Sequence, residues 1–290
     1  MAKLEYTFKT DILFKMLFVK HTDLLKQLVC ELLGLRLENI GEFYVTNPEM
    51  PPESLADKFC RLDINMTVNG QRVDLEIQVR NEGDYPERTL FNWARVYSTA
   101  LPSGGAYKDL PRTVIISIIN FNLFECEEYN SEYQALEVRR HTPLTDKMNL
   151  YFFELCKLPK EVSADDMRLL WLTLFKADTE EELAKIELME VPVMEQAIQA
   201  YHQITADSEF RERERLYELA RHNEASALRH ARDEGKAEGK AEGKAEGKAE
   251  EALEIARKMK NAGRPLSEIT EFTGLPAESI DKIKAMGFSE

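Results

Sequence analysis

Two acidic residues in a strictly alternating segment are the strongest candidates for chemistry in this chain. Residues 61–79 alternate between polar and apolar side chains on both sides of Asn69-Gly70. Asn-Gly favours a two-residue type I′ turn, so the segment is predicted to be a β-hairpin. In that register Asp63 lies opposite Glu76 on the polar face of the hairpin.

Opposed carboxylates on neighbouring strands have Cβ atoms roughly 5 Å apart, and like charges at that distance destabilise the pair. A divalent cation would offset the repulsion, because ions such as Mg²⁺ are commonly bound by one or two carboxylates together with water and phosphate. One interpretation is therefore a metal site for phosphodiester chemistry. The other is an ordinary antiparallel hairpin whose polar face is solvated.

The composition describes a soluble globular protein with a strongly charged surface. Of its 290 residues, 43% are hydrophobic and 31% are charged, and the formal net charge is −14. No apolar run is long enough for a transmembrane helix, and the first residues do not resemble a secretory signal, so we expect a cytoplasmic protein without a membrane partner. The four cysteines are widely separated, which fits a reducing compartment better than a disulfide framework or a zinc ribbon. The negative charge means that any nucleic acid must bind to a locally positive face.

The elements that must position the two acids alternate between helices and strands. Helical periodicity over residues 10–33, with a possible break at 21–23, precedes a strand at 42–46 and then the hairpin. A helix follows at 87–101, and residues 112–120 form an apolar, β-branched strand that suits burial on both faces. A further strand or loop is expected at 151–155. This order predicts an α/β fold with a mixed sheet.

The second half of the sequence is predominantly helical. Helices are expected at 167–175, 180–189 and 193–232. The sequence Gly-Lys-Ala-Glu then repeats four times before residue 251. Its glycines disfavour a helix, so we expect a marginal helix or a semi-flexible spacer, with close helix–helix packing as the alternative.

Residues 251–289 show a helix-turn-helix pattern without a basic cluster, so self-association is at least as well supported there as base recognition. The predicted division of the chain is a core at 1–160, a helical extension at 161–232, a repeat linker at 233–250 and a small helical unit at 251–290.

Several segments together resemble one group of nucleases. Asp63 on one strand and Glu76-x-Gln78 on the next, in α-β-β-β-α-β order, resemble the PD-(D/E)XK superfamily. Residues 11–18, 93–97 and 107–111, and the Gly-Lys-Ala-Glu repeat, are similar to the recombination-promoting nuclease (Rpn) and transposase family. The resemblance covers residues 4–160 well. It implies a restriction-endonuclease-like α/β core with a mixed sheet and an α-helical C-terminal extension.

The resemblance also implies a metal-dependent DNA endonuclease that uses Mg²⁺ or another divalent cation, in bacterial DNA recombination, mobile elements or defence. Asp63 and Glu76 would bind the metal, and the backbone carbonyl of Ile77 would join them. Asp11 would supply an outer or second-ion carboxylate, or simply cap the first helix.

The expected motif has a lysine where this chain has Gln78, which can orient water but carries no charge. Lys15, one helical turn after Asp11, and Arg61, opposite Gln78, are the candidates for the missing cation. We favour Lys15, whose alternative role is that of an ordinary surface lysine.

One polar stripe of the helix after Pro86 contains Arg88, Asn92 and Arg95. With Arg61, these residues are the predicted DNA contacts, unless the stripe is merely a solvated helix face. The alternative function is a non-catalytic nuclease-fold protein that oligomerises, as a dimer, through its C-terminal helices.

Overall fold

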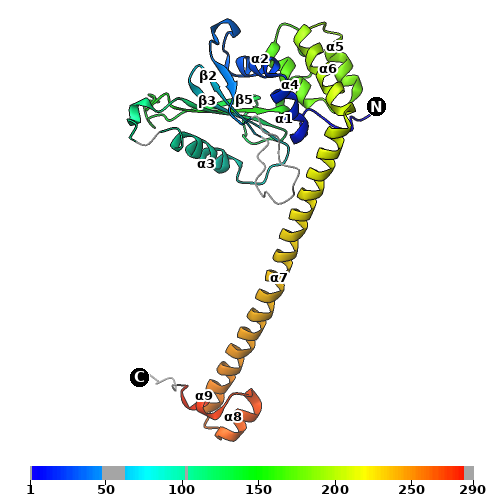
Figure 1. The fold of residues 1–290 in the computed structure, drawn as a ribbon. Coiled ribbons are helices and arrows are strands. Elements are labelled where there is room, and N and C mark those ends of the chain that lie inside the picture. Colours follow the sequence, from blue (N-terminus) through cyan, green and yellow to red (C-terminus); the bar gives the residue numbers. More distant parts are fainter. Residues whose placement is uncertain (1, 48–62, 102–103, 284–290) are drawn as a thin grey trace. The chain divides into compact units, whose positions relative to one another are not determined.

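The computed structural model describes residues 2–47, 63–101 and 104–283 (Figure 1). The chain divides into two compact units, Met1–Glu218 and Leu219–Glu290. The first unit contains the sheet and most of the core, and the described part of the second consists of helices joined by short turns.

A six-stranded mixed sheet forms the centre of the first unit, with the order β1-β2-β3-β4-β6-β5. β3 runs parallel to β4, and β4 to β6, whereas the remaining neighbours are antiparallel. This arrangement confirms the predicted α/β class. The strands are β1 (Phe43–Val45), β2 (Ile64–Val68), β3 (Gln71–Gln78), β4 (Thr113–Ile119), β5 (Asn130–Tyr133) and β6 (Met148–Glu154).

The predicted hairpin register is confirmed. Asn65 pairs with Asp74, and Ile64 pairs with Leu75. The turn residues Asn69 and Gly70 both have positive φ, at 48° and 75°, as a type I′ turn requires. Continuing this register by one residue brings Asp63, which directly precedes β2, opposite Glu76.

Helices cover both faces of the sheet (Figure 1). α1 (Asp11–Lys20), α2 (Thr22–Leu33) and α4 (Met167–Lys176) pack on the face that carries Leu75 and Ile116, in the main core. α3 (Tyr85–Ser98) packs on the other face, against Ile115 and Phe152. The predicted break between the first two helices is confirmed, because His21 separates them.

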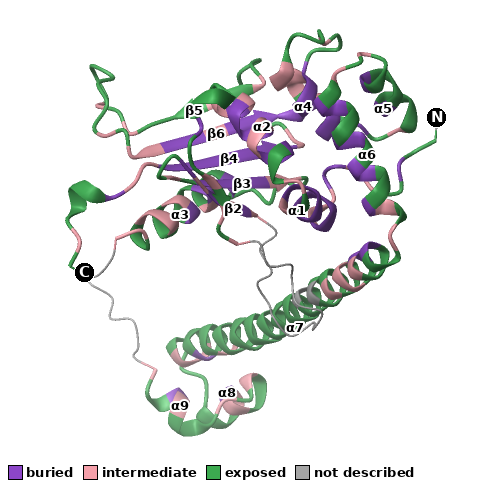
Figure 2. Ribbon diagram, turned by 45° about the horizontal axis from the view of Figure 1, so that its top comes forward, coloured by how far each residue is buried: buried purple, intermediate pink, exposed green. Residues whose placement is uncertain are grey.

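The central strands are the most buried part of the sheet (Figure 2). Every residue of β4 is buried, as its apolar sequence predicted. β6 is an inner strand rather than a loop. β5 was not predicted, because its short sequence Asn-Ser-Glu-Tyr is polar and mostly exposed.

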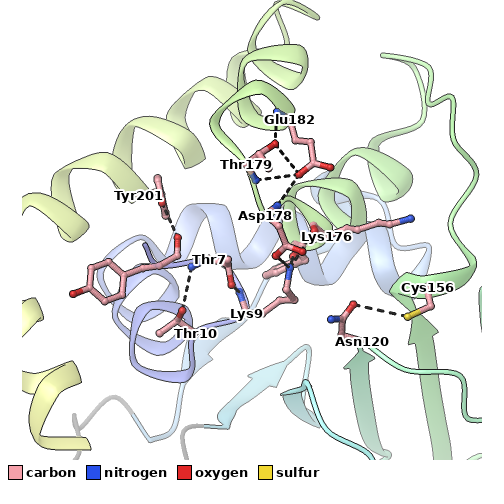
Figure 3. Close-up of polar contacts among 12 residues, drawn as sticks. Thr7, Lys9, Thr10, Asn120, Cys156, Lys176, Asp178, Thr179, Glu182 and Tyr201 are labelled. Carbon is pink, nitrogen blue, oxygen red and sulfur yellow. Dashed lines mark hydrogen bonds and ion pairs between the residues drawn. The ribbon is translucent and has the colours of Figure 1, made fainter. Parts of the chain in front are cut away.

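Hydrogen bonds tie the later helices to the start of the chain (Figure 3). The buried ammonium of Lys9 donates to the carbonyls of Phe175 and Lys176 at the end of α4 and forms an ion pair with Asp178. A capping box of Thr179 and Glu182 begins the next helix. The later helices are α5 (Glu180–Glu187), α6 (Pro192–Ala206) and α7 (Ser208–Asn261). The helix predicted from residue 193 to 232 is therefore interrupted at Asp207, where α6 ends.

The second unit contains the C-terminal part of α7, α8 (Leu266–Thr273) and α9 (Ala277–Asp281). Its small core consists of Ala256, Ile269 and Ile280. The Gly-Lys-Ala-Glu repeat is helical and exposed throughout. A Cβ added at any of its glycines would meet nothing within 4 Å in the described chain, so the structure gives no support to close packing there. Among the described residues, no helix is both long and apolar enough to cross a membrane.

Candidate metal centre

Three acidic side chains converge where β2 begins and β3 passes through the sheet. Asp63, Asp74 and Glu76 each offer a carboxylate oxygen, and these oxygens lie within 4.8 Å of one another. Asp74 is 1% exposed and Glu76 is 6% exposed, whereas Asp63 is half-buried. We call these three residues the acidic triad.

The burial of the triad follows from the position of α3. Alternation places Asp74 and Glu76 on the same face of β3, and α3 covers that face. The amide Nδ2 of Asn92 donates to Glu76 Oε1 at 2.9 Å, and the Tyr85 hydroxyl lies 3.4 Å from Glu76 Oε2. The interpretation of this face as merely solvated is therefore wrong.

Burial, followed by the charge of Glu76, raises the pKa of Tyr85. The hydroxyl is therefore neutral at physiological pH and can donate its proton in a hydrogen bond. Both oxygens of Glu76 are thus held from α3 by neutral donors. Such donors orient a carboxylate without cancelling its charge.

Two further side chains fix the backbone of Asp63. Asn47, just after β1, donates from Nδ2 to the Asp63 carbonyl at 2.9 Å and accepts from the Asn65 N–H at 2.8 Å. The ammonium of Lys15 lies 3.4 Å from the same carbonyl. Lys15 is 3% exposed, so it is a buried residue beside the triad and not an ordinary surface lysine.

Gln78 lies two residues after Glu76, at the end of β3, and is half-buried. Its Nε2 donates to the Arg80 carbonyl at 3.0 Å, so the amide is positioned by the loop that follows the strand. Ile77 pairs with Ile118 of β4, and metal binding by its carbonyl stays a prediction.

Asp11 lies outside the acidic triad. It is half-buried in the first turn of α1 and accepts a hydrogen bond from the Tyr217 hydroxyl at 3.2 Å. Thr10 is the N-cap residue of that helix. The role of Asp11 as a second-ion ligand stays a prediction. Arg61, the other candidate for the missing cation, lies outside the described residues.

The predicted DNA-binding stripe of α3 is divided between two environments. Arg95 is exposed, whereas Arg88 stacks over the Tyr85 ring at 4.9 Å and pairs with Glu82 at 2.9 Å. Asn92 is buried and bonded to Glu76, so its placement on an exposed stripe was wrong. Asn92 points inward because the strand beneath this part of α3 carries Glu76, to which it donates a hydrogen bond.

Asp74 is a residue of the site that was not predicted from the sequence. The signal was available, since Asp74-x-Glu76 puts two carboxylates on one side of one strand. Tyr85 and Asn92 gave no comparable signal as partners of Glu76. Their contact depends on how α3 crosses the sheet.

The triad suits a hard divalent cation. Three carboxylates held this close repel one another, and oxygen ligands are those that Mg²⁺ and Ca²⁺ prefer. The residues present therefore fit a metal site, with Asp63, Asp74 and Glu76 as its candidate ligands.

Comparisons with known proteins agree with this geometry. A family model described as PD-(D/E)XK nuclease family transposase matches residues 8–231. No curated protein and no solved structure gave a significant match. The family match covers well over half of the chain, including the triad, its hairpin and α3, and so the chain belongs to the PD-(D/E)XK nuclease family transposases.

Proposed function

We propose that this protein is a metal-dependent DNA endonuclease that hydrolyses phosphodiester bonds with Mg²⁺ as its expected ion. The observation that carries the proposal is the convergence of three carboxylates, two of them buried, at one point of a nuclease-family fold. The family description names transposases, which supports transposition or DNA recombination as its setting, and we place this activity in the cytoplasm.

When bound, a divalent cation supplies the positive charge that polarises a scissile phosphate and lowers the pKa of an attacking water. The chain's own residues would hold and orient it. Asp63, Asp74 and Glu76 are the ligands, and Asn92 and Tyr85 keep the Glu76 carboxylate in position.

The two roles of the lysine that the motif usually contains, charge stabilisation and orientation of water, fall to Lys15 and Gln78 respectively. The ammonium of Lys15 reaches the edge of the triad from α1 and would stabilise negative charge on the reacting phosphate. The Gln78 amide, on the same face as Glu76, can hold a water molecule by hydrogen bonding but adds no charge.

Plasmid nicking in Mg²⁺ tests the proposal. Wild-type protein should nick supercoiled DNA, and Asp63→Ala, Asp74→Asn and Glu76→Ala should each lose the activity. Glu127→Gln is the matched control, because Glu127 is an exposed acid in the loop before β5. Equal nicking by the wild type and all the triad variants would show that the activity is contamination or belongs to another site.

Self-association through the helical C-terminal region is a second proposed property, and it would remain if the protein were not catalytic. The second unit leaves apolar side chains exposed around a three-residue core, notably Leu266 and Phe272. Sedimentation of the full chain and of Phe272→Ser would test this. A dimer in the wild type that dissociates in the variant supports the proposal, and a monomeric wild type refutes it.

A further inference from the structure

The connection between β5 and β6 is an ordered hairpin arm, residues 134–146. Its two sides are joined by hydrogen bonds from the Glu137 N–H to the Thr142 carbonyl at 2.9 Å and from the Leu144 N–H to the Ala135 carbonyl at 2.8 Å. At the turn, the Glu137 carboxylate accepts the backbone N–H groups of Arg139 and Arg140. These bonds give the arm a defined shape of its own.

This ordered arm holds apolar side chains in water. Val138 is 87% exposed and Leu144 is 82% exposed, and almost the whole arm is drawn as exposed in Figure 2. Backbone and side-chain hydrogen bonds, rather than burial, fix its shape. An ordered segment that exposes large apolar side chains is typical of a contact surface.

The charge of the arm indicates the kind of partner. The arm carries two acids, Glu137 and Asp146, but its tip, residues 138–145, contains Arg139, Arg140 and His141 and no acidic residue, in a chain whose formal net charge is −14. Arg140 contacts Glu137 only at 3.6 Å, and Arg139 is exposed. A basic tip of this kind on an acidic protein favours a polyanion over another copy of the same acidic chain.

The strand register places the base of the arm on the same face as the acidic triad. Asp74 pairs with Ile115, Ile115 with Leu150, and Leu150 with Tyr133, the last residue of β5. Three strand spacings separate Asp74 from Tyr133, which is roughly 14 Å. That distance is shorter than one turn of B-DNA, about 34 Å, so one duplex can span the triad and the arm.

Two more exposed arginines lie at this end of the first unit. Arg72 shares the face of Asp74 and pairs with Thr113, which in turn pairs with Met148 just after the arm. Trp93 of α3 bonds to the Thr113 carbonyl at 3.1 Å, which brings the half of α3 that carries Arg95 to the same end of the sheet. Arg72 and Arg95 therefore lie at the end of the sheet from which the arm projects.

We propose that the arm is a second DNA-contact surface, which holds the duplex whose backbone is cleaved at the triad. Arg139 and Arg140 contact phosphates, and Val138 and Leu144 pack into the adjoining groove. This inference rests on the proposed nuclease function and extends it by naming a surface, remote from the metal ligands, that binds double-stranded DNA.

Fluorescence anisotropy with a labelled duplex about three helical turns long tests the proposal in Ca²⁺ over a series of KCl concentrations. The variant Arg139→Gln/Arg140→Gln should bind roughly tenfold more weakly at physiological salt, and the slope of log affinity against log salt should fall by about 2. The control Lys20→Gln/Arg36→Gln removes the same charge from exposed positions elsewhere and should bind like the wild type.

A second variant, Val138→Ser/Leu144→Ser, separates the apolar from the electrostatic contribution. It should lower affinity without changing the salt slope, because apolar contacts release no counterions. Thermal melting should match the wild type for every arm variant, since the changed side chains are exposed.

Wild-type affinity and salt slope in the arginine variant would overturn the proposal and would indicate a protein partner for the arm instead. If the serine variant binds DNA with wild-type affinity, then Val138 and Leu144 do not contribute to DNA binding. The same variants, assayed for nicking in Mg²⁺, separate this inference from the nuclease proposal. Arm-dependent binding without any nicking would refute only the nuclease function, and nicking with arm-independent binding would refute only the role of the arm.

Discussion

Glu76 and Glu154 are both buried on the same face of the sheet, but their surroundings differ. Glu154 is fully buried and forms an ion pair with Lys157 at 2.7 Å. It also accepts the backbone N–H of Leu123 at 2.6 Å. Its negative charge is therefore neutralised within the fold, and it anchors the loop that follows β4.

Glu76 lies instead in a group with Asp63 and Asp74. From α3 it accepts hydrogen bonds from the neutral donors Asn92 and Tyr85. Lys15 brings a positive charge to the edge of this group of carboxylates. A buried charge that is balanced in place stabilises or specifies structure, whereas a cluster of three carboxylates is suited to a cation from solution.

The largest difference should appear in stability without metal. Glu154→Gln leaves Lys157 without its anionic partner and should cost about 3 kcal/mol of unfolding free energy. Asp74→Asn in EDTA should keep or gain stability, because it removes a repulsion between neighbouring carboxylates. Urea unfolding measures both, and an equal loss in the two variants would contradict the distinction between the sites.

Lys15 should matter for rate rather than for DNA binding. Removing its charge with Lys15→Gln should slow nicking about a hundredfold, since a fixed cation near the reacting phosphate stabilises developing negative charge. Lys20→Gln, an exposed lysine on the same helix, is the control and should nick like the wild type. A Lys15→Gln variant with normal nicking would assign Lys15 to folding alone.

Asn92 should act through Glu76. Asn92→Leu keeps the size of the side chain and removes the donor, and it should weaken Mn²⁺ binding about tenfold, as loss of a hydrogen bond to a metal ligand commonly does. Trp93→Phe removes the neighbouring bond to the Thr113 carbonyl and should leave Mn²⁺ affinity unchanged. Equal losses in the two variants would mean that α3 has only a structural role.

Tyr85 should give the smallest effect, visible only at high pH. Because burial and Glu76 raise its pKa, the folded protein keeps a proton that the unfolded chain loses above about pH 10. The unfolding free energy should therefore fall as pH rises beyond that point, by up to about 1.4 kcal/mol per pH unit from this group. Tyr85→Phe should show a shallower decline, and an identical pH dependence would contradict the buried, neutral hydroxyl.

Local signals explain why the hairpin could be predicted from the sequence. Alternation and the Asn69-Gly70 turn act over a few residues, and together they fix the register that brings Asp63 opposite Glu76. The break at His21 was likewise visible in the sequence around it. β5 could not be predicted, because its polar residues adopt a strand only by pairing with β6.

The partners of the triad depend on contacts between distant segments. A polar stripe on an amphipathic helix ordinarily marks the solvent side. For this reason Asn92 was predicted to be exposed, whereas it is buried. Only the packing of α3 over a polar strand turns the residue inward. The convergence of Asp74 with Asp63 similarly depends on how side chains from two strands reach a common point, which alternation alone does not determine.

Calorimetric titration with Mn²⁺ tests the metal centre most directly. Wild-type protein and Glu127→Gln should bind Mn²⁺, with release of the bound ion on addition of excess Mg²⁺. Asp74→Asn should lose this binding while remaining folded, because it removes one of the three ligands without adding bulk. Unchanged Mn²⁺ binding in folded Asp74→Asn would contradict a metal centre at the triad.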